Sequence, residues 1–169
     1  MSSSPISPTP SNSPTPPAVR ISRAGAGDVP LVAALFDQYR QFYGRPSDAP
    51  GAERFVGERV LRDESVVFAA LSGFGPRCRA HGFVQLYPTY SSVWMQRVWI
   101  LNDLFVEEAS RRFGIARSLL KHAAHFAKQD GAKRLVLSTA ADNTPAKALY
   151  TSLGWKKDER FEHFQLELA

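Results

Sequence analysis

The stretch SRRFGIARSLLKHAAHFAK (residues 110–128) places two arginines and a glycine directly before a long amphipathic helical pattern. The first N–H groups of a helix have no intrahelical partner and, together with the helix dipole, they favour negative charge. Arg111 and Arg112 are cationic, so they are either ordinary solvated residues or the counterparts of an anion from outside the chain. Gly114 is either a tight turn or the residue whose missing Cβ lets a ligand reach the backbone. The stretch therefore predicts a phosphate site at a helix start.

The charge distribution points to the same segment. The formal net charge is +5 and the pI is about 9.6. Residues 107–134 contain seven basic and three acidic side chains, which accounts for most of that net charge. The basic residues do not continue beyond the helix, so we expect an anionic small molecule and no nucleic acid as partner.

The sequence gives little indication of disulfide bonds, a metal site or a membrane span. Cys78 is the single cysteine, so we expect no disulfide framework, no thiolate metal cage and a cytoplasmic location. His122 and His125 are three residues apart but lack a third ligand, so we expect no metal. No apolar run approaches the roughly 20 residues of a membrane span, and no membrane partner is expected.

The chain divides into two parts by composition. Residues 1–17 contain six Ser, six Pro, two Thr and no charge, which predicts a disordered tail. Residues 18–169 predict one folded domain.

The elements that must position the phosphate site follow from hydrophobic periodicity and turn residues. Strands are expected at residues 19–22, 65–71, 78–91, 97–108, 134–139 and 159–168, with one more short strand possible at 155–158. Helices are expected near residues 28–42, 50–62, 114–128 and 143–153. This order predicts an α+β fold with a mixed, mostly antiparallel sheet of six to seven strands and about four helices.

The spacing of the residues in this loop makes the prediction of a phosphate site more specific. RRFGIA at residues 111–116, after a strand ending in LNDLFVEE, resembles the Q/R-x-x-G-x-G/A motif of the GNAT superfamily of acyl-CoA N-acyltransferases. About 35 residues further on, NTPAKALYTSLGW resembles the second motif of that family, in which Phe or Trp follows a glycine. Ala116 stands where glycine is commoner, and Phe113 is bulky for the loop.

That resemblance implies acetyl-CoA as co-substrate. It implies that the central parallel strands splay apart, that the loop amides hold the pyrophosphate, and that the strand before the loop pairs with the pantetheine arm. The implied cofactor-binding residues are Leu104, Phe105, Val106, Arg111, Arg112, Phe113, Gly114, Ile115, Ala116, Asn143, Lys147 and Tyr150.

Acyl transfer to an amine needs a neutral amine, a donor for the oxyanion and a proton for the leaving thiolate. By the resemblance, Tyr150 is the proton donor; a core aromatic is the alternative. Asp103 is the candidate base or amine-binding acid, because an acid in an apolar strand is costly unless it is paired or used. A structural hydrogen-bonding role is its alternative. Asn102 beside it predicts a bulge directed at the cleft.

The acceptor is expected beside the first helix and the aromatic hairpin. The substrate-binding candidates are Tyr39, Tyr43, Tyr87, Asn102 and Asp103. The aromatic residues form a cation-binding wall, or they pack against each other or a second subunit. The chain resembles the histone-, polyamine- and amino-acid-acetylating branch of the family, so we expect acetylation of a small primary amine in a ternary complex, by a homodimer. Protein acetylation and a non-catalytic CoA-binding module are the alternatives.

Overall fold

The computed structural model describes residues 17–168, so all but the last residue of the predicted tail lies outside the described residues. Its elements are β1 (Arg20–Arg23), α1 (Val29–Phe42), α2 (Ala49–Leu61), β2 (Val66–Ser72), β3 (Arg79–Ser91), β4 (Gln96–Val106), α3 (Ile115–Gln129), β5 (Arg134–Leu137) and α4 (Thr144–Ser152). The predicted order of elements is confirmed as far as α4.

The sheet of the described residues has five strands in the order β1-β2-β3-β4-β5. The first four are antiparallel neighbours, and β4 and β5 are parallel. A parallel pair needs a crossover, and here α3 supplies it. The fold is therefore α+β with a mixed, mostly antiparallel sheet, as predicted.

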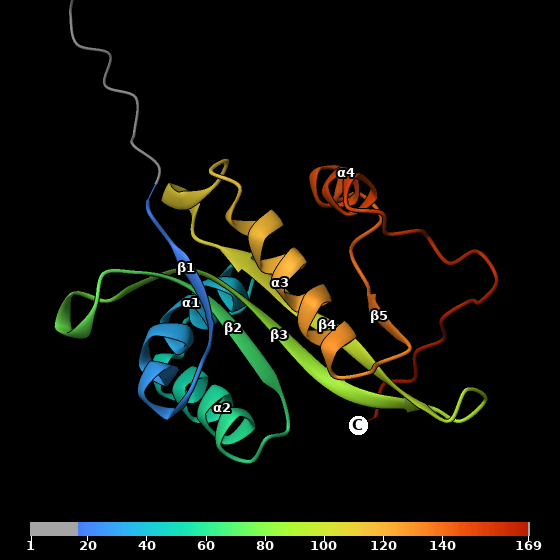
Figure 1. Cartoon of the computed structure of the whole chain (residues 1–169). Coiled ribbons are helices and arrows are strands. Elements are labelled where there is room, and N and C mark those ends of the chain that lie inside the picture. The colour runs from blue at the N-terminus through green and yellow to red at the C-terminus, as the bar shows by residue number, and fades with distance from the viewer. Residues whose placement is uncertain (1–16, 169) are drawn as a thin grey trace, which may run out of the picture.

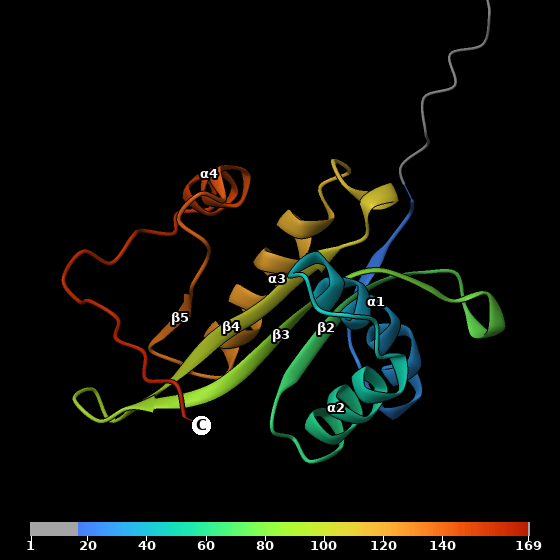
Figure 2. The same cartoon turned by 180° about the vertical axis from the view of Figure 1, so that it is seen from behind.

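Helices cover both faces of this sheet (Figure 1). On one face, residues of α1 and α2 such as Val32, Leu35 and Val56 form a buried core with Phe83 of β3. On the other face, Leu119 of α3 packs in a second core, and the reverse view shows α1 and α2 opposite α3 (Figure 2). Because both faces are buried, β2 and β4 are apolar along most of their length.

The two parallel strands diverge at one end. Their pairing runs from Val98 opposite Arg134 to Leu101 opposite Leu137. Beyond that point β4 continues to Val106, whereas β5 ends at Leu137. The β5 side of the last part of β4 therefore keeps backbone N–H and C=O groups that no strand of residues 17–168 pairs.

The number of strands is where the sequence prediction is wrong. Residues 155–158 and 159–168 form no strand among the described residues, so the sheet has five strands and not six to seven. The alternation in the last segment is real, but Phe164, Leu166 and Leu168 are 91%, 83% and 87% exposed. Alternating polarity gives a strand only where one face of it is buried, and here no face is.

The longest described helix is α3, with 15 residues. Its solvent-facing side carries charged residues such as Lys121. Within residues 17–168, no helix combines the length and the apolar character that crossing a membrane requires.

Candidate active site

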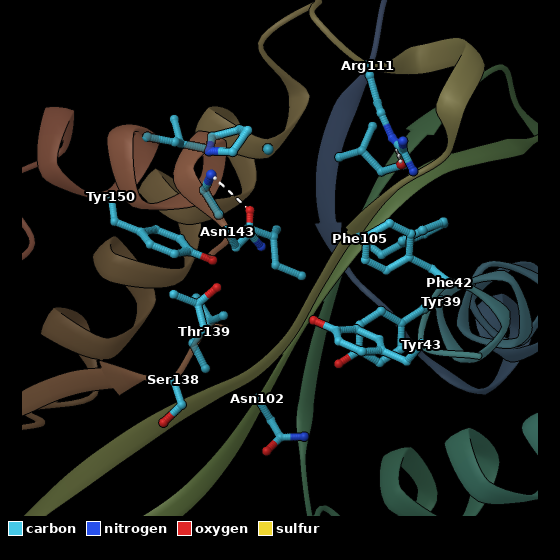
Figure 3. Close-up of a pocket in the computed structure, with 17 residues that line it drawn as sticks. Tyr39, Phe42, Tyr43, Asn102, Phe105, Arg111, Ser138, Thr139, Asn143 and Tyr150 are labelled. Atoms are coloured by element: carbon cyan, nitrogen blue, oxygen red, sulfur yellow. Dashed lines mark hydrogen bonds between the residues drawn. The ribbon is translucent and has the colours of Figure 1, made fainter. Parts of the chain in front are cut away.

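A cleft of about 350 Å³ opens where β4 and β5 separate. Residues of α1, β4, the segment after β5, and α4 form its walls (Figure 3). The lining residues are Tyr39, Phe42, Tyr43, Leu101, Asn102, Leu104, Phe105, Val106, Arg111, Ala116, Ser138, Thr139, Asn143, Pro145, Ala146, Leu149 and Tyr150. A cleft of this size and mixed polarity is typical of a small-molecule site.

The start of α3 borders this cleft and is open to a ligand. Gly114 is its N-cap, with φ 80° and ψ 4°, and no side chain caps the helix. The first turn contains no acidic residue. Arg112 also has a positive φ of 67°. A hollow of about 340 Å³ adjoins this turn and is lined by Arg111, Arg112, Gly114 and Arg117 among others. Uncapped N–H groups and cationic side chains together favour an anion here.

Arg111 belongs to both the cleft and the hollow. Its Nε donates a hydrogen bond to the Val106 carbonyl oxygen at 3.0 Å. Its guanidinium carbon lies 5.8 Å from the ring centre of Phe105 and 6.0 Å from that of Phe42. The Arg111 guanidinium therefore places a positive charge beside the part of β4 that extends beyond its pairing with β5.

The end of α1 forms the opposite wall. Figure 3 shows the hydroxyl groups of Tyr39 and Tyr43 directed into the cleft. Asp37 holds this end of the helix by accepting hydrogen bonds from the Asp48 amide at 2.8 Å and from the Ser47 hydroxyl at 2.6 Å. These two bonds hold the pKa of Asp37 below its ordinary value.

The predicted bulge in β4 is present, but Asp103 is not among the residues that line the cleft. Gln85 pairs with Asp103 and Leu86 with Leu101, so Asn102 is the extra residue. Asn102 lines the cleft. Asp103 instead shares the α1 face of the sheet with Phe105, two residues on, and is 5% exposed. Because Asp103 does not line the cleft, its role as base or amine-binding acid stays a prediction.

Asp103 lies directly behind the cleft wall. Burial raises the pKa of its carboxyl, and hydrogen bonds from Asn102 and Tyr39 offset only part of that effect. The Asn102 amide nitrogen lies 3.2 Å from each carboxylate oxygen. Burial, and then the neighbouring Asp103, raise the pKa of Tyr39 in turn. The hydroxyl of Tyr39 therefore stands between the buried acid and the cleft.

Helix α4 supplies the third wall. Asn143 caps it, because its side-chain oxygen accepts a hydrogen bond from the Ala146 amide at 3.3 Å. Tyr150 directs its hydroxyl into the cleft from the side facing Tyr39 and Tyr43 (Figure 3). Burial, and then the proximity of Tyr43, raise the pKa of Tyr150. Its hydroxyl therefore keeps its proton at neutral pH.

Besides Asp103, three predicted site residues line neither the cleft nor the hollow. Tyr87 does not line the cleft; it is half-buried, and burial followed by the charge of Asp103 raises its pKa to about 12. The Lys147 ammonium donates to the Ala141 carbonyl oxygen at 2.9 Å and lies outside the lining residues. Phe113 lines neither the cleft nor the hollow.

The cleft lining also contains seven residues that were not among the predicted site residues: Phe42, Leu101, Ser138, Thr139, Pro145, Ala146 and Leu149. Ser138 and Thr139 follow β5 directly and face the cleft, and Phe42 comes from the last turn of α1. The signal for Ser138 and Thr139 was available, because polar residues at the carboxyl end of a parallel strand commonly line a binding crevice. Among residues 17–168, no group of three or more His, Cys, Asp and Glu side chains is arranged to hold a metal ion.

Comparisons with known proteins agree with this geometry. Residues 32–155 match the model of the acetyltransferase (GNAT) family. The chain is 42% identical over 150 residues to the "Uncharacterized N-acetyltransferase YhfO" of Bacillus subtilis (strain 168), covering 89% of this chain and 98% of that protein. A "Probable acetyltransferase" of Haemophilus influenzae is 29% identical over 151 residues, with coverages of 89% and 99%.

A solved structure shows the same fold. The crystal structure of a probable acetyltransferase superposes with a TM-score of 0.82 at 40% identity, covering 89% of this chain and 98% of that one. The chain therefore belongs to the GNAT acetyltransferase family. It is an acetyl-CoA-dependent N-acetyltransferase.

The residues present fit acetyl-CoA. The uncapped, basic start of α3 suits the pyrophosphate, and open space around Gly114 leaves its backbone accessible. The unpaired edge of β4 beyond Leu101 suits an extended pantetheine arm.

Proposed function

We propose that the protein transfers the acetyl group of acetyl-CoA to a primary amine of a small molecule, such as a polyamine or an amino acid, by direct attack in a ternary complex. The observation that carries the proposal is one cleft with an anion-binding helix start at one end and hydroxyl groups on two facing walls. The cleft lies between the walls formed by α1 and α4, which favours a small acceptor over a protein surface.

The bound acetyl-CoA supplies a thioester. The residues of the chain bind and orient the reactants and transfer the protons. The α3 amides with Arg111 and Arg112 hold the phosphates. Tyr150 donates its hydroxyl proton to the departing sulfur. Asn102 and the unpaired β4 backbone beside it orient the amine and the thioester carbonyl.

The amine must lose a proton before it attacks. An ordinary alkyl ammonium has a pKa of about 10.4, so its deprotonation at pH 7 costs roughly 4 to 5 kcal/mol. Asp103 accepts this proton through the Tyr39 hydroxyl, which receives it on the cleft side and gives up its own to the buried carboxylate. Asp103 is thus a base that acts through Tyr39 and does not touch the acceptor.

Binding and turnover test the proposal separately. We expect about 1 mM acetyl-CoA to raise the melting temperature of the protein. A ligand at about a hundred times its Kd stabilises the folded state by about 2.7 kcal/mol. A panel of spermidine, lysine, an aminoglycoside and a histone-tail peptide is then assayed for thiol release, with turnover expected for a small amine. An unchanged melting temperature contradicts the proposal, and release with the peptide alone indicates protein acetylation.

Asp103→Asn is expected to lower kcat/KM for the amine about 100-fold, because it removes the proton acceptor. The base works only when ionised, and burial raises its pKa, so wild-type kcat/KM should fall as the pH is lowered through that raised pKa. The variant should lose this acidic limb, and Tyr39→Phe should reproduce the loss. A pH–rate profile that keeps its acidic limb in Asp103→Asn assigns the limb to another group.

We also propose that the protein is a homodimer and that it is located in the cytoplasm. The tip of the β3–β4 hairpin supports the dimer, because Val93, Trp94 and Met95 are exposed there in the single chain. Exposed apolar side chains grouped in this way are common at subunit interfaces. The single cysteine supports the location.

A further inference from the structure

A second cluster of buried polar side chains lies where β4 leaves the sheet. Glu107 follows the last residue of β4 and is 9% exposed, and His81 and Ser110 are 6% and 4% exposed. None of the three has a part in the reaction described above. Burying a carboxylate is energetically unfavourable unless its oxygens accept several hydrogen bonds. The groups around Glu107 must therefore compensate for its burial.

Three side chains, those of Arg79, His81 and Ser110, lie within hydrogen-bond distance of the Glu107 carboxylate. Arg79 Nη2 lies 3.0 and 2.9 Å from its two oxygens. The Ser110 hydroxyl donates to Oε1 at 2.7 Å, and His81 Nδ1 lies 3.0 Å from the same oxygen. The other ring nitrogen of His81 lies 2.7 Å from the Ser72 hydroxyl at the end of β2. Burial alone would raise the pKa of Glu107, but the bonds from Ser110 and Arg79 outweigh it and lower that pKa.

The cluster joins the sheet to the segment before α3. The Glu107 amide donates to the His81 carbonyl oxygen at 3.0 Å, which attaches this residue to β3. The Ser110 amide donates to the Glu107 carbonyl oxygen, also at 3.0 Å, and closes the short turn Glu108–Ser110. Ser110 therefore touches Glu107 through both its backbone and its side chain. It also lines the hollow at the start of α3, so one residue is shared by the cluster and the anion site.

We propose that Glu107 is a positioning residue for the pyrophosphate site: by holding Ser110 against β3 through Arg79 and His81, it sets where the segment carrying Arg111, Arg112 and Gly114 begins. The other end of that segment is fixed by the buried residues of α3, such as Ile115. With both ends held, the free N–H groups are preorganised and the ligand does not have to order them. The inference rests on the proposed function, because it concerns the same acetyl-CoA site.

Arg79 has a second task in this arrangement. A carboxylate close to a phosphate site repels the ligand unless its charge is balanced. Arg79 balances it with a two-oxygen contact, although its own side chain is 62% exposed. The Glu107–Arg79 ion pair therefore carries no net charge, while the carboxylate still holds Ser110.

Glu107→Gln is the direct test, because it removes the charge and keeps the shape. Its KM for acetyl-CoA and its Kd for CoA, measured by calorimetry, should rise about tenfold, whereas kcat and the KM for the amine change less than about twofold. Asp63→Asn is the matched control: this exposed carboxylate pairs with Arg23 at 3.4 Å, and the variant should bind CoA as the wild type does.

Two further variants keep the inference testable if Glu107→Gln folds poorly. Ser110→Ala removes the link but not the charge, and should raise the Kd for CoA several-fold while lowering the melting temperature only by the few degrees that the loss of one buried hydrogen bond costs. Arg79→Gln should raise it through the unbalanced carboxylate, and adding Glu107→Gln to Arg79→Gln should recover part of the loss.

The outcomes separate this inference from the proposed function. If the wild type does not bind CoA, the proposed function fails and the inference fails with it. If the wild type binds CoA but Ser110→Ala and Glu107→Gln match it, only the inference is overturned. Equal rises in the KM values for acetyl-CoA and the amine also overturn it, because they indicate general loss of structure.

Discussion

Gly114→Val is expected to abolish acetyl-CoA binding while the protein stays folded. Gly114 has a φ of 80°, and a Cβ at this position would meet no heavy atom within 4 Å. The effect therefore comes from the backbone, because a β-branched residue does not tolerate this conformation. The α3 amides would turn away from the phosphates, and the loss of two or three charge-assisted hydrogen bonds should raise the Kd for CoA more than about 100-fold. Calorimetric titration with CoA measures it.

Gly131 provides a matched control at the other end of α3. Its φ is 71°, and a Cβ there would also meet nothing within 4 Å. Gly131→Val should lower the free energy of unfolding by a similar amount, about 1–3 kcal/mol, but leave the Kd for CoA unchanged. Equal weakening of CoA binding in both variants would show that strain in α3, and not the anion site, is responsible.

Tyr150→Phe is expected to lower kcat about 100-fold and to leave the Kd for acetyl-CoA within about twofold of the wild-type value. The substitution removes only the hydroxyl group, and the ring can keep its contact with Trp155, whose ring centre lies 6.0 Å away. Because burial raises the pKa of Tyr150, the wild-type hydroxyl stays protonated at neutral pH and can donate to the leaving thiolate. Steady-state kinetics with calorimetry measure the two quantities separately.

The leaving group itself gives the sharper check on Tyr150. An acetyl thioester whose thiol has a lower pKa needs less help from a proton donor, so it should restore part of the lost kcat. Tyr90→Phe is the control, since this hairpin hydroxyl lies in an exposed residue and accepts a hydrogen bond from Arg97 at 3.2 Å. Parallel losses in kcat and in acetyl-CoA affinity would assign Tyr150 to binding or packing.

Strong periodic patterns made most of the fold predictable. Helix α3 was expected at residues 114–128 and lies at Ile115–Gln129. It was predictable because its apolar residues repeat at helical spacing and its basic residues lie on the opposite, outer face. Strand β4 was expected at residues 97–108 and lies at Gln96–Val106. The last strand, expected at residues 159–168, was wrong because alternation indicates only that a segment can pair, and pairing also needs a neighbouring edge and a face to bury.

The acceptor side shows the limit of sequence reasoning more clearly. Asn102 and Asp103 were expected together at the cleft, and the bulge between them was correctly predicted. The bulge, however, places Asn102 in the cleft wall and Asp103 among the buried residues behind Tyr39. Both faces of β4 are covered by helices, so its apolar pattern does not tell which face a polar side chain takes.

The sequence by itself determined the local features of this protein: where α3 starts, that Gly114 precedes it, and that Arg111 and Arg112 concentrate positive charge there. Such features depend on residues that are neighbours along the chain, where a few backbone angles decide the geometry. Only the tertiary structure decided which side chains share the cleft, because Tyr39, Asn102 and Tyr150 come from three elements. Their meeting depends on where β4 and β5 diverge, and that is a property of packing across the whole sheet.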